Sequence, residues 1–162
     1  MPVNRKNVKT AVQYYYEIPN MMRLLRQEKD ELESLYDSLG SVNMDGMPHG
    51  SAPGRGVEGL AMRTDSRGVW ERLQEIDVRQ QVLEGDEAAL RDVMDSLNGK
   101  YKNLLSMRYC YRYSWVKISV RLSVPDSTVR SWHERALLAL ADGLKDAPMM
   151  EEILGRASRA RF

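Results

Sequence analysis

Cysteine, histidine and long apolar stretches are scarce in this 162-residue chain, and each scarcity excludes a class of protein. The single cysteine, Cys110, cannot form an intramolecular disulfide or a cysteine-based zinc cluster. No apolar run approaches the roughly 18 residues of a membrane span, so no membrane association is expected. The first ten residues lack the apolar core of a secretory signal. We therefore expect a reduced, cytoplasmic compartment.

Catalytic groupings are also missing from the sequence. The two histidines, His49 and His133, make no convincing metal site with one cysteine. No set of nucleophile, base and acid is apparent. We therefore expect no enzyme, and we assign no catalytic, cofactor-binding or metal-binding residues.

Charge is distributed unevenly, although the formal net charge is only +1. Residues 69–97 carry three basic and eight acidic residues, whereas residues 98–146 carry nine basic and four acidic residues. The second segment, at +5, suits a polyanion, because each neutralised phosphate releases counterions. A solvated surface would explain the charge alone equally well.

Apolar residues in two segments recur at alternating intervals of four and three. The first segment holds positions 18, 22, 25, 29, 32, 36 and 39, and the second holds 69, 73, 76, 80, 83, 87, 90, 94 and 97. A polar residue interrupts each seam near its middle, Lys29 in one and Gln80 in the other. This spacing predicts a helical hairpin or coiled coil over residues 1–97, with the polar positions fixing register. Two independent amphipathic helices are the alternative, and the seams could pair within one chain or between two.

Two features are expected to interrupt the helices of residues 1–97. An early helix over 8–17 is expected to end or kink at Pro19. Residues 40–68 contain seven of the eleven glycines, together with Pro48 and Pro53. We predict a long, glycine-rich loop over 40–68.

Three shorter helices are predicted in residues 98–146. The first covers 101–111, and the second covers 115–122 with Ser114 as its N-cap. Ser123, Val124 and Pro125 make a tight turn, and a longer helix follows over about 126–144. Two helices joined by a three-residue turn describe a helix-turn-helix. Residues 147–162 are predicted to be a basic tail, with Arg156, Arg159 and Arg161 either solvated or in contact with phosphate.

The last of these helices has two chemically different faces at about 100° per residue. The apolar face, suited to a domain core, holds Val129, Trp132, Ala136 and Leu140. The opposite, polar face holds Ser127, Arg130, Ser131 and Glu134. Short polar groups with an arginine near a helix N-terminus are typical of a recognition helix in the major groove of DNA.

Residues 97–144 resemble the region-four helix-turn-helix of bacterial sigma-70-type factors. The matching features are LLSMRY at 104–109, the Ser114-Trp115 pair with Ile118 and Leu122, the V..STV start at 124–129 and RALLAL at 135–140. The resemblance implies that the protein binds promoter or operator sites in double-stranded DNA. RNA polymerase is a further candidate partner. The region that melts promoter DNA in sigma factors is not recognised here, so a self-sufficient sigma factor is not expected.

A second resemblance covers the N-terminal two-thirds of the chain. The IPN entry at 18–20, the heptad helix and DGMPHGS at 45–51 are similar to small Firmicutes phage and prophage proteins. Together with the helix-turn-helix, they resemble phage late-gene activators of the RinA and ArpU type. This resemblance implies a bacterial host.

The resemblance to sigma region four also implies which residues contact DNA, because positions early in its recognition helix can be matched to positions in this chain. It implies that Asp126, Ser127 and Ser131 contact base edges, and that Thr128 and Arg130 contact phosphates. The remaining candidates are Glu134 and Arg135 farther along the helix, and Lys117 and Arg121 on the helix before it.

The chain departs from the sigma pattern at three neighbouring positions. Ser123 stands where glycine is usual, so a left-handed turn there would cost about 1 kcal/mol. Pro125 replaces the usual Ser or Thr cap, which shifts the helix start. Asp126 stands where arginine is common, and an acidic group is repelled by DNA unless it accepts a hydrogen bond from cytosine.

Three functions are compatible with the sequence. The leading hypothesis is a sequence-specific DNA-binding transcription regulator of phage or prophage type, dimerising through its heptad helices. The alternatives are a DNA-packaging oligomer similar to a small terminase subunit, and a structural interaction protein whose helix-turn-helix no longer binds DNA.

Overall fold

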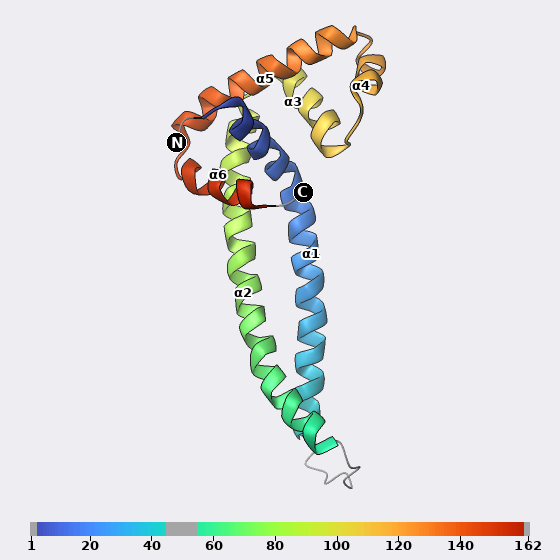
Figure 1. Ribbon diagram of the computed structural model, residues 1–162, viewed down its shortest axis with the longest axis vertical. Helices are drawn as coiled ribbons and strands as arrows, with labels where there is room; N and C mark the ends of the chain where they lie inside the picture. Colours follow the sequence, from blue (N-terminus) through green and yellow to red (C-terminus); the bar gives the residue numbers. More distant parts are fainter. Residues whose placement is uncertain (1–2, 45–54, 161–162) are drawn as a thin grey trace. The chain divides into compact units, whose positions relative to one another are not determined.

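The computed structural model describes residues 3–44 and 55–160, and this part of the chain is all-α without a strand, as predicted. Two long helices, α1 (Arg5–Met44) and α2 (Arg55–Asp95), come first (Figure 1). They are followed by α3 (Gly99–Leu105), a π-helical turn η1 (Ser106–Cys110), α4 (Trp115–Leu122), α5 (Asp126–Asp146) and α6 (Met150–Arg159). Over these residues, no helix combines the length and apolarity needed to cross a membrane.

The chain forms two compact units, and each of the two long helices contributes to both. One unit, the hairpin unit, is Asn20–Leu83. The other, the C-terminal unit, combines Met1–Pro19 with Glu84–Phe162. The first turns of α1 and the last turns of α2 therefore belong with the helices that follow them.

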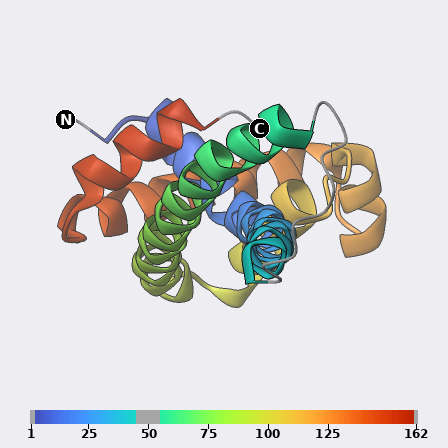
Figure 2. The same cartoon turned by 90° about the horizontal axis from the view of Figure 1, so that it is seen from below.

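In the hairpin unit, α1 and α2 run side by side in opposite directions (Figures 1 and 2). Lys29 Nζ lies 2.9 Å from Asp77 Oδ1, and the hydrogen bond raises the pKa of Lys29. Arg72 donates to both carboxylate oxygens of Glu28, at 2.7 and 3.1 Å. These ion pairs join the two helices of one chain, so α1 and α2 are paired within the molecule at this level.

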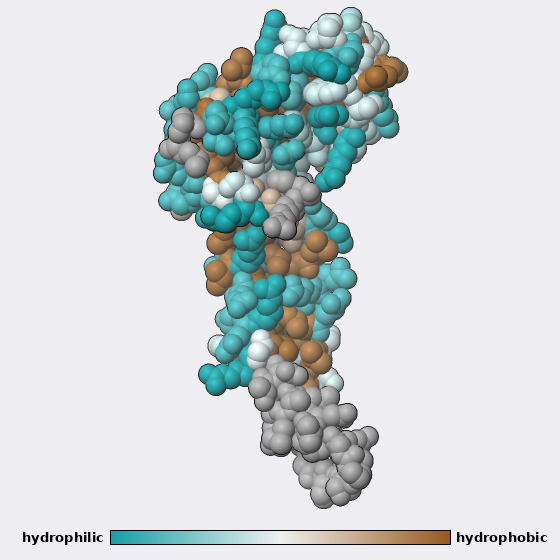
Figure 3. Space-filling view, in the orientation of Figure 1, coloured by the Kyte–Doolittle hydropathy of each residue, from teal (hydrophilic) through white to brown (hydrophobic). Residues whose placement is uncertain are grey.

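Some large apolar side chains of the hairpin unit face solvent. Figure 3 shows apolar residues between charged ones along the two long helices. The exposed members in this unit are Leu24, Leu35, Tyr36, Trp70 and Val78. The seam between α1 and α2 therefore does not use all of the apolar surface of the pair.

The predicted end of a helix at Pro19 is wrong, because α1 continues through this residue. The alternative, a kink at Pro19, stays a prediction. A proline inside a helix removes one backbone hydrogen bond and costs about 3 kcal/mol. Pro19 itself is exposed, whereas Val8, Tyr14 and Ile18 before it are completely buried. The burial of these side chains holds the first turns of α1 in place and offsets the local penalty.

The predicted loop over 40–68 is wrong for residues 40–44 and 55–68, which are helical. Residues 45–54, which include the whole DGMPHGS motif, lie outside the described part. Glycine costs a helix up to about 1 kcal/mol per residue, but each residue added to an existing helix gains a hydrogen bond. Propagation from the two long helices therefore extends past isolated glycines.

The prediction of a basic tail over 147–162 is wrong for most of its length. Residues Met150–Arg159 form α6, which buries Met150, Ile153, Leu154 and Ala157. These four positions follow the i, i+3, i+4, i+7 spacing of an amphipathic helix. The prediction of a tail rested on the charge of this segment and not on the spacing of its apolar residues.

A buried ion pair holds α6 against the rest of the C-terminal unit. The guanidinium of Arg156 donates to both oxygens of Asp86 on α2, at 2.6 and 2.7 Å. The Tyr14 hydroxyl on α1 donates to the same carboxylate at 2.7 Å. Asp86 is only 3% exposed. Arg156 is therefore a structural cation and not one of the solvated or phosphate-binding arginines predicted for a tail.

Candidate nucleic-acid interface

A small apolar core fixes the geometry of α3, α4 and α5. Leu104, Ile118 and Val129, one from each helix, are completely buried together. The half-buried residues packed around them are Met107, Tyr113, Trp115, Leu122, Val124 and Trp132. Two helices thus meet a third around one cluster, which fixes the orientation of α5.

The connection from α4 to α5 has the tight turn that the sequence predicts. Ser114 caps α4 by accepting a hydrogen bond from the Lys117 backbone at 3.2 Å. Ser123 adopts the left-handed conformation with φ 54°, at the position where glycine is usual in the resembling family. The Ser119 hydroxyl donates to the Val124 carbonyl at 2.5 Å and closes the turn. Helix α5 then begins at Asp126, directly after Pro125.

The two faces of α5 differ in burial as predicted. Its buried residues are Val129, His133, Ala136, Leu137, Leu140 and Leu144. On the polar face, Ser127, Arg130, Ser131 and Glu134 are exposed. A row of short polar groups near the N-terminus of α5 is therefore accessible from solvent.

Two of the predicted contact residues bind each other. Asp126 Oδ2 lies 3.2 Å from Arg130 Nε, one helical turn away. The second carboxylate oxygen of Asp126 is buried, and Thr128 is half-buried. A base contact from Asp126 would require its pair with Arg130 to open. Ser127 and Ser131 need no such rearrangement.

The cationic candidates on α4 are exposed and rest on an aromatic ring. The Lys117 ammonium lies 4.0 Å from the centroid of the Tyr113 ring, and the Arg121 guanidinium lies 5.1 Å from it. Arg135 on α5 is also exposed. Cation–π contacts of this kind order a long side chain and leave its charge available to a polyanion.

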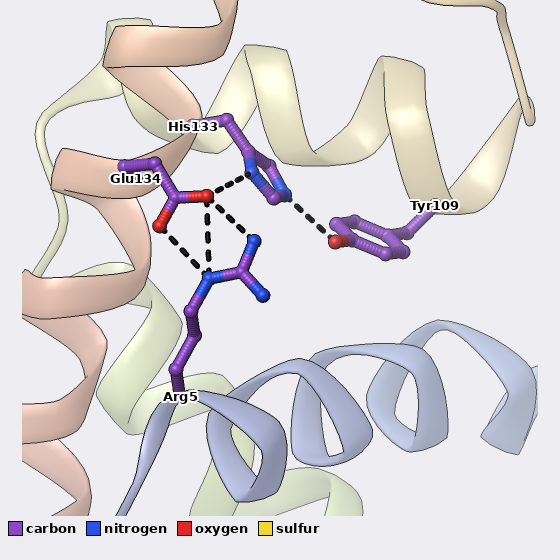
Figure 4. A network of polar contacts seen from close by, with 4 residues as sticks. All are labelled: Arg5, Tyr109, His133 and Glu134. Carbon is purple, nitrogen blue, oxygen red and sulfur yellow. Dashed lines mark hydrogen bonds and ion pairs between the residues drawn. The ribbon is translucent and has the colours of Figure 1, made fainter.

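Glu134, the last residue of the polar face, is paired with the beginning of α1 (Figure 4). Arg5 Nε lies 2.9 Å from Glu134 Oε2, and Arg5 Nη2 lies 2.6 Å from Glu134 Oε1. The hydrogen bonds from Arg5 lower the pKa of Glu134 and raise the pKa of Arg5. The carboxylate is therefore ionised and neutralised by an arginine 129 positions away in sequence.

A buried histidine lies directly behind this ion pair. His133 is 4% exposed, and its Nε2 lies 2.7 Å from the Tyr109 hydroxyl (Figure 4). The rings of His133 and Trp115 pack in a T-shaped arrangement, with the centroids 4.9 Å apart. Burial lowers the pKa of His133 to about 4, so the ring is neutral at pH 7. His133 therefore belongs to the packing of the domain.

An open groove of about 630 Å³ runs between the first turns of α1, the π-helical turn and α5. Its basic residues are Arg5, Lys9, Arg108, Arg112 and Arg130, and its acidic residues are Glu17 and Glu134. Of the five cations, only Arg130 was among the sequence candidates. Arg5 and Lys9 were missed because they lie far from the helix-turn-helix in sequence. Their i, i+4 spacing was the one signal that they share a face.

Over residues 3–44 and 55–160, the structure brings together no group of three or more His, Cys, Asp or Glu residues that could hold a metal ion. The surface described above carries hydroxyls and cations, together with the carboxylates Glu17, Asp126 and Glu134, each paired with an arginine.

The arrangement of α4, turn and α5 around one core defines a helix-turn-helix domain. Residues 87–140 match the family model described as sigma-70, region 4. The match begins in the last turns of α2 and ends within α5, so it includes α4, the turn and α5 as far as residue 140. Region 4 is a DNA-binding fold of regulatory proteins, and the match supports a DNA-binding regulator of the helix-turn-helix kind. No curated protein and no solved structure matches the chain.

Proposed function

We propose that this protein is a sequence-specific DNA-binding transcription regulator that inserts the N-terminal turns of α5 into the major groove. The observation that carries the proposal is the division of α5. Ser127, Arg130 and Ser131 are exposed, while Val129 and Ala136 are completely buried in the core of the domain. Serine reads either base type by hydrogen bonds, and arginine pairs with guanine or with phosphate.

The positions of the candidates suggest different roles in the complex. We propose Ser127 and Ser131 for base edges and Arg130 for phosphate. Lys117, Arg121 and Arg135 are proposed as backbone contacts that fix the register of the domain on the duplex, because such contacts carry affinity and not sequence information.

The test is a selection of duplexes from a random pool, followed by fluorescence anisotropy. The wild-type protein should bind a selected duplex at least about a thousandfold more tightly than a scrambled one. Ser131→Ala should reduce that ratio by weakening the selected duplex alone. Lys145→Gln, a charge change in the last turn of α5, is the matched control and should leave the ratio unchanged. Binding that ignores sequence in the wild type would refute the proposal.

The phage or prophage role, the bacterial cytoplasm as compartment and RNA polymerase as a partner are also proposals. They rest on the resemblance of the helix-turn-helix and of the IPN and DGMPHGS segments. Transcription of a reporter from the selected site with purified polymerase tests the role and the partner together. Increased or decreased output in the presence of the protein would support regulation, and unchanged output would count against it.

A homodimer is proposed because a single helix-turn-helix reads few base pairs, and two copies raise specificity. Ion pairs already join α1 and α2 within one chain, so the dimer would use outward-facing apolar residues of the hairpin unit, such as Leu24, Trp70 and Val78. Light scattering with mass determination tests this. A dimer supports the proposal, whereas a monomer refutes it, and a large closed ring would favour the packaging alternative.

A further inference from the structure

The first turns of α1 present a row of polar side chains beside the polar face of α5. Arg5, Lys9, Gln13 and Glu17 recur every fourth residue, and all four line the groove next to Arg130 and Glu134. Side chains at i and i+4 lie on one face of a helix. This face of α1 therefore forms one wall of the groove, and α5 contributes to the other.

The cations of the groove differ in how fully they are neutralised. Arg5 is paired with Glu134, and Arg112 Nη2 lies 3.3 Å from Glu17 Oε2. Arg108 donates to the neutral carbonyl of Tyr113 at 2.9 Å and keeps its full charge.

Lys9 is the cation most available to a ligand. It is exposed, and its ammonium makes no hydrogen bond or ion pair with any of the described residues. Lys9 follows Arg5 by one helical turn, a rise of about 6 Å, and Arg5 touches α5 through Glu134. A flexible lysine stem can place a point charge on a phosphate that flanks a bound helix.

The negative charge of Glu134 is neutralised by Arg5. An unpaired carboxylate on the polar face of α5 would be repelled by the phosphates on either side of the major groove. Arg5 binds both oxygens of Glu134 and leaves a neutral pair at this end of the face. The first turn of α1 thus removes a negative charge from the surface that α5 presents.

We infer that the first turns of α1 are part of the DNA-binding surface, with Lys9 binding a backbone phosphate and Arg5 neutralising Glu134. This inference rests on the proposed function. The groove takes the sugar–phosphate backbone next to the major groove that α5 occupies. Arg5 is a positioning residue in this scheme, whereas Lys9 contacts the ligand.

The test of Lys9 is the salt dependence of duplex binding by the full chain. In Lys9→Gln, the slope of log K against log salt should become shallower by about 0.9, the value for one lost phosphate contact. The preference for the selected over the scrambled duplex should not change. Lys6→Gln is the matched control, since Lys6 is exposed on the same turns but does not line the groove.

The test of Arg5 is a double-mutant comparison. Arg5→Ala should weaken binding about fivefold, because it exposes the charge of Glu134 to the duplex. Glu134→Gln in the Arg5→Ala background should restore affinity to within about twofold of the wild type. A double variant as weak as Arg5→Ala would overturn the neutralising role.

The outcomes separate this inference from the proposed function. If the wild type prefers the selected duplex and Lys9→Gln has the wild-type slope, the role of α1 is refuted and the role of α5 stands. If the wild type shows no preference, the proposed function fails first. Inorganic phosphate that binds the wild type and not Lys9→Gln, with unchanged slopes on DNA, would assign the groove to a small anion and overturn the inference.

Discussion

Replacement of Arg156 is expected to destabilise the C-terminal unit strongly, because it leaves a buried carboxylate unpaired. Asp86 is 3% exposed and accepts two of its three hydrogen bonds from this guanidinium. The third comes from the neutral hydroxyl of Tyr14, which cannot balance a charge. Breaking a buried pair by removing one partner costs about 3–5 kcal/mol. We expect a loss of this size in Arg156→Leu, which keeps apolar volume while removing the cation.

A second substitution tests whether the loss of stability in Arg156→Leu arises from the unpaired charge of Asp86. Asp86→Asn combined with Arg156→Leu removes both charges and keeps a hydrogen-bond acceptor for Tyr14. Because replacing both partners of a buried pair is often close to neutral, this double variant should recover most of the loss. Arg159→Leu, on the exposed side of the same helix, is the matched control and should change stability by less than about 0.5 kcal/mol.

The assay is urea unfolding followed by tryptophan fluorescence in a Trp70→Phe background. Trp115 and Trp132 then report only on the C-terminal unit, because Trp70 is in the hairpin unit. With a slope of about 2 kcal/mol per molar urea, the expected loss moves the midpoint down by roughly 1.5–2.5 M. A shift of less than about 0.5 M in Arg156→Leu, or a double variant no more stable than this single one, would refute the reasoning.

Three further predictions concern other residues. The pKa of His133 is about 4 in the folded protein and near 6.5 in the unfolded chain. The contribution of His133 to stability should therefore be complete above pH 6.5 and should fall by up to roughly 3 kcal/mol as the pH decreases towards 4. Unfolding measured as a function of pH should show a much flatter profile over this window in His133→Gln. Ser123→Gly should raise the unfolding midpoint by the equivalent of about 1 kcal/mol, because φ is 54° at this residue; an unchanged midpoint would contradict the strain. Lys29→Ala should leave the midpoint of thermal unfolding almost unchanged, since its pair with Asp77 is partly exposed to solvent; a clearly lower midpoint would contradict this.

The helix-turn-helix could be predicted from sequence because its signals are local. Ser114 satisfies a backbone donor three residues away, and the Ser123–Pro125 turn ends one helix directly before the next. The burial of Val129 and Ala136 follows from periodicity within α5. Each of these features depends on residues within a few positions of one another, so each can be predicted from the sequence alone.

The errors arose where tertiary contacts override local preference. A proline usually ends a helix unless tertiary packing holds the helix in place, and the burial of Tyr14 and Ile18 cannot be read from the residues next to Pro19. The apolar face of α6 could have been predicted, because the helical spacing of its buried residues is visible in the sequence; the arginines of residues 147–162 instead led to the prediction of a tail.

The groove was missed for a related reason. Arg5 and Glu134 are separated by 129 positions, and no periodicity connects them. A pair of this kind becomes visible only when the first turn of α1 is placed against α5.

Because the C-terminal unit is assembled from two stretches of sequence, it cannot be excised as one continuous fragment. A truncation that starts at residue 98 would discard Tyr14, Asp86 and the two cations at the beginning of α1, and would strand Arg156 without its anion. Engineering a minimal binder therefore calls for retaining both termini and shortening the hairpin between them. Exchange of the C-terminal half alone would break the unit as well, because Asp86 and Glu134 have partners, Tyr14 and Arg5, at the beginning of α1.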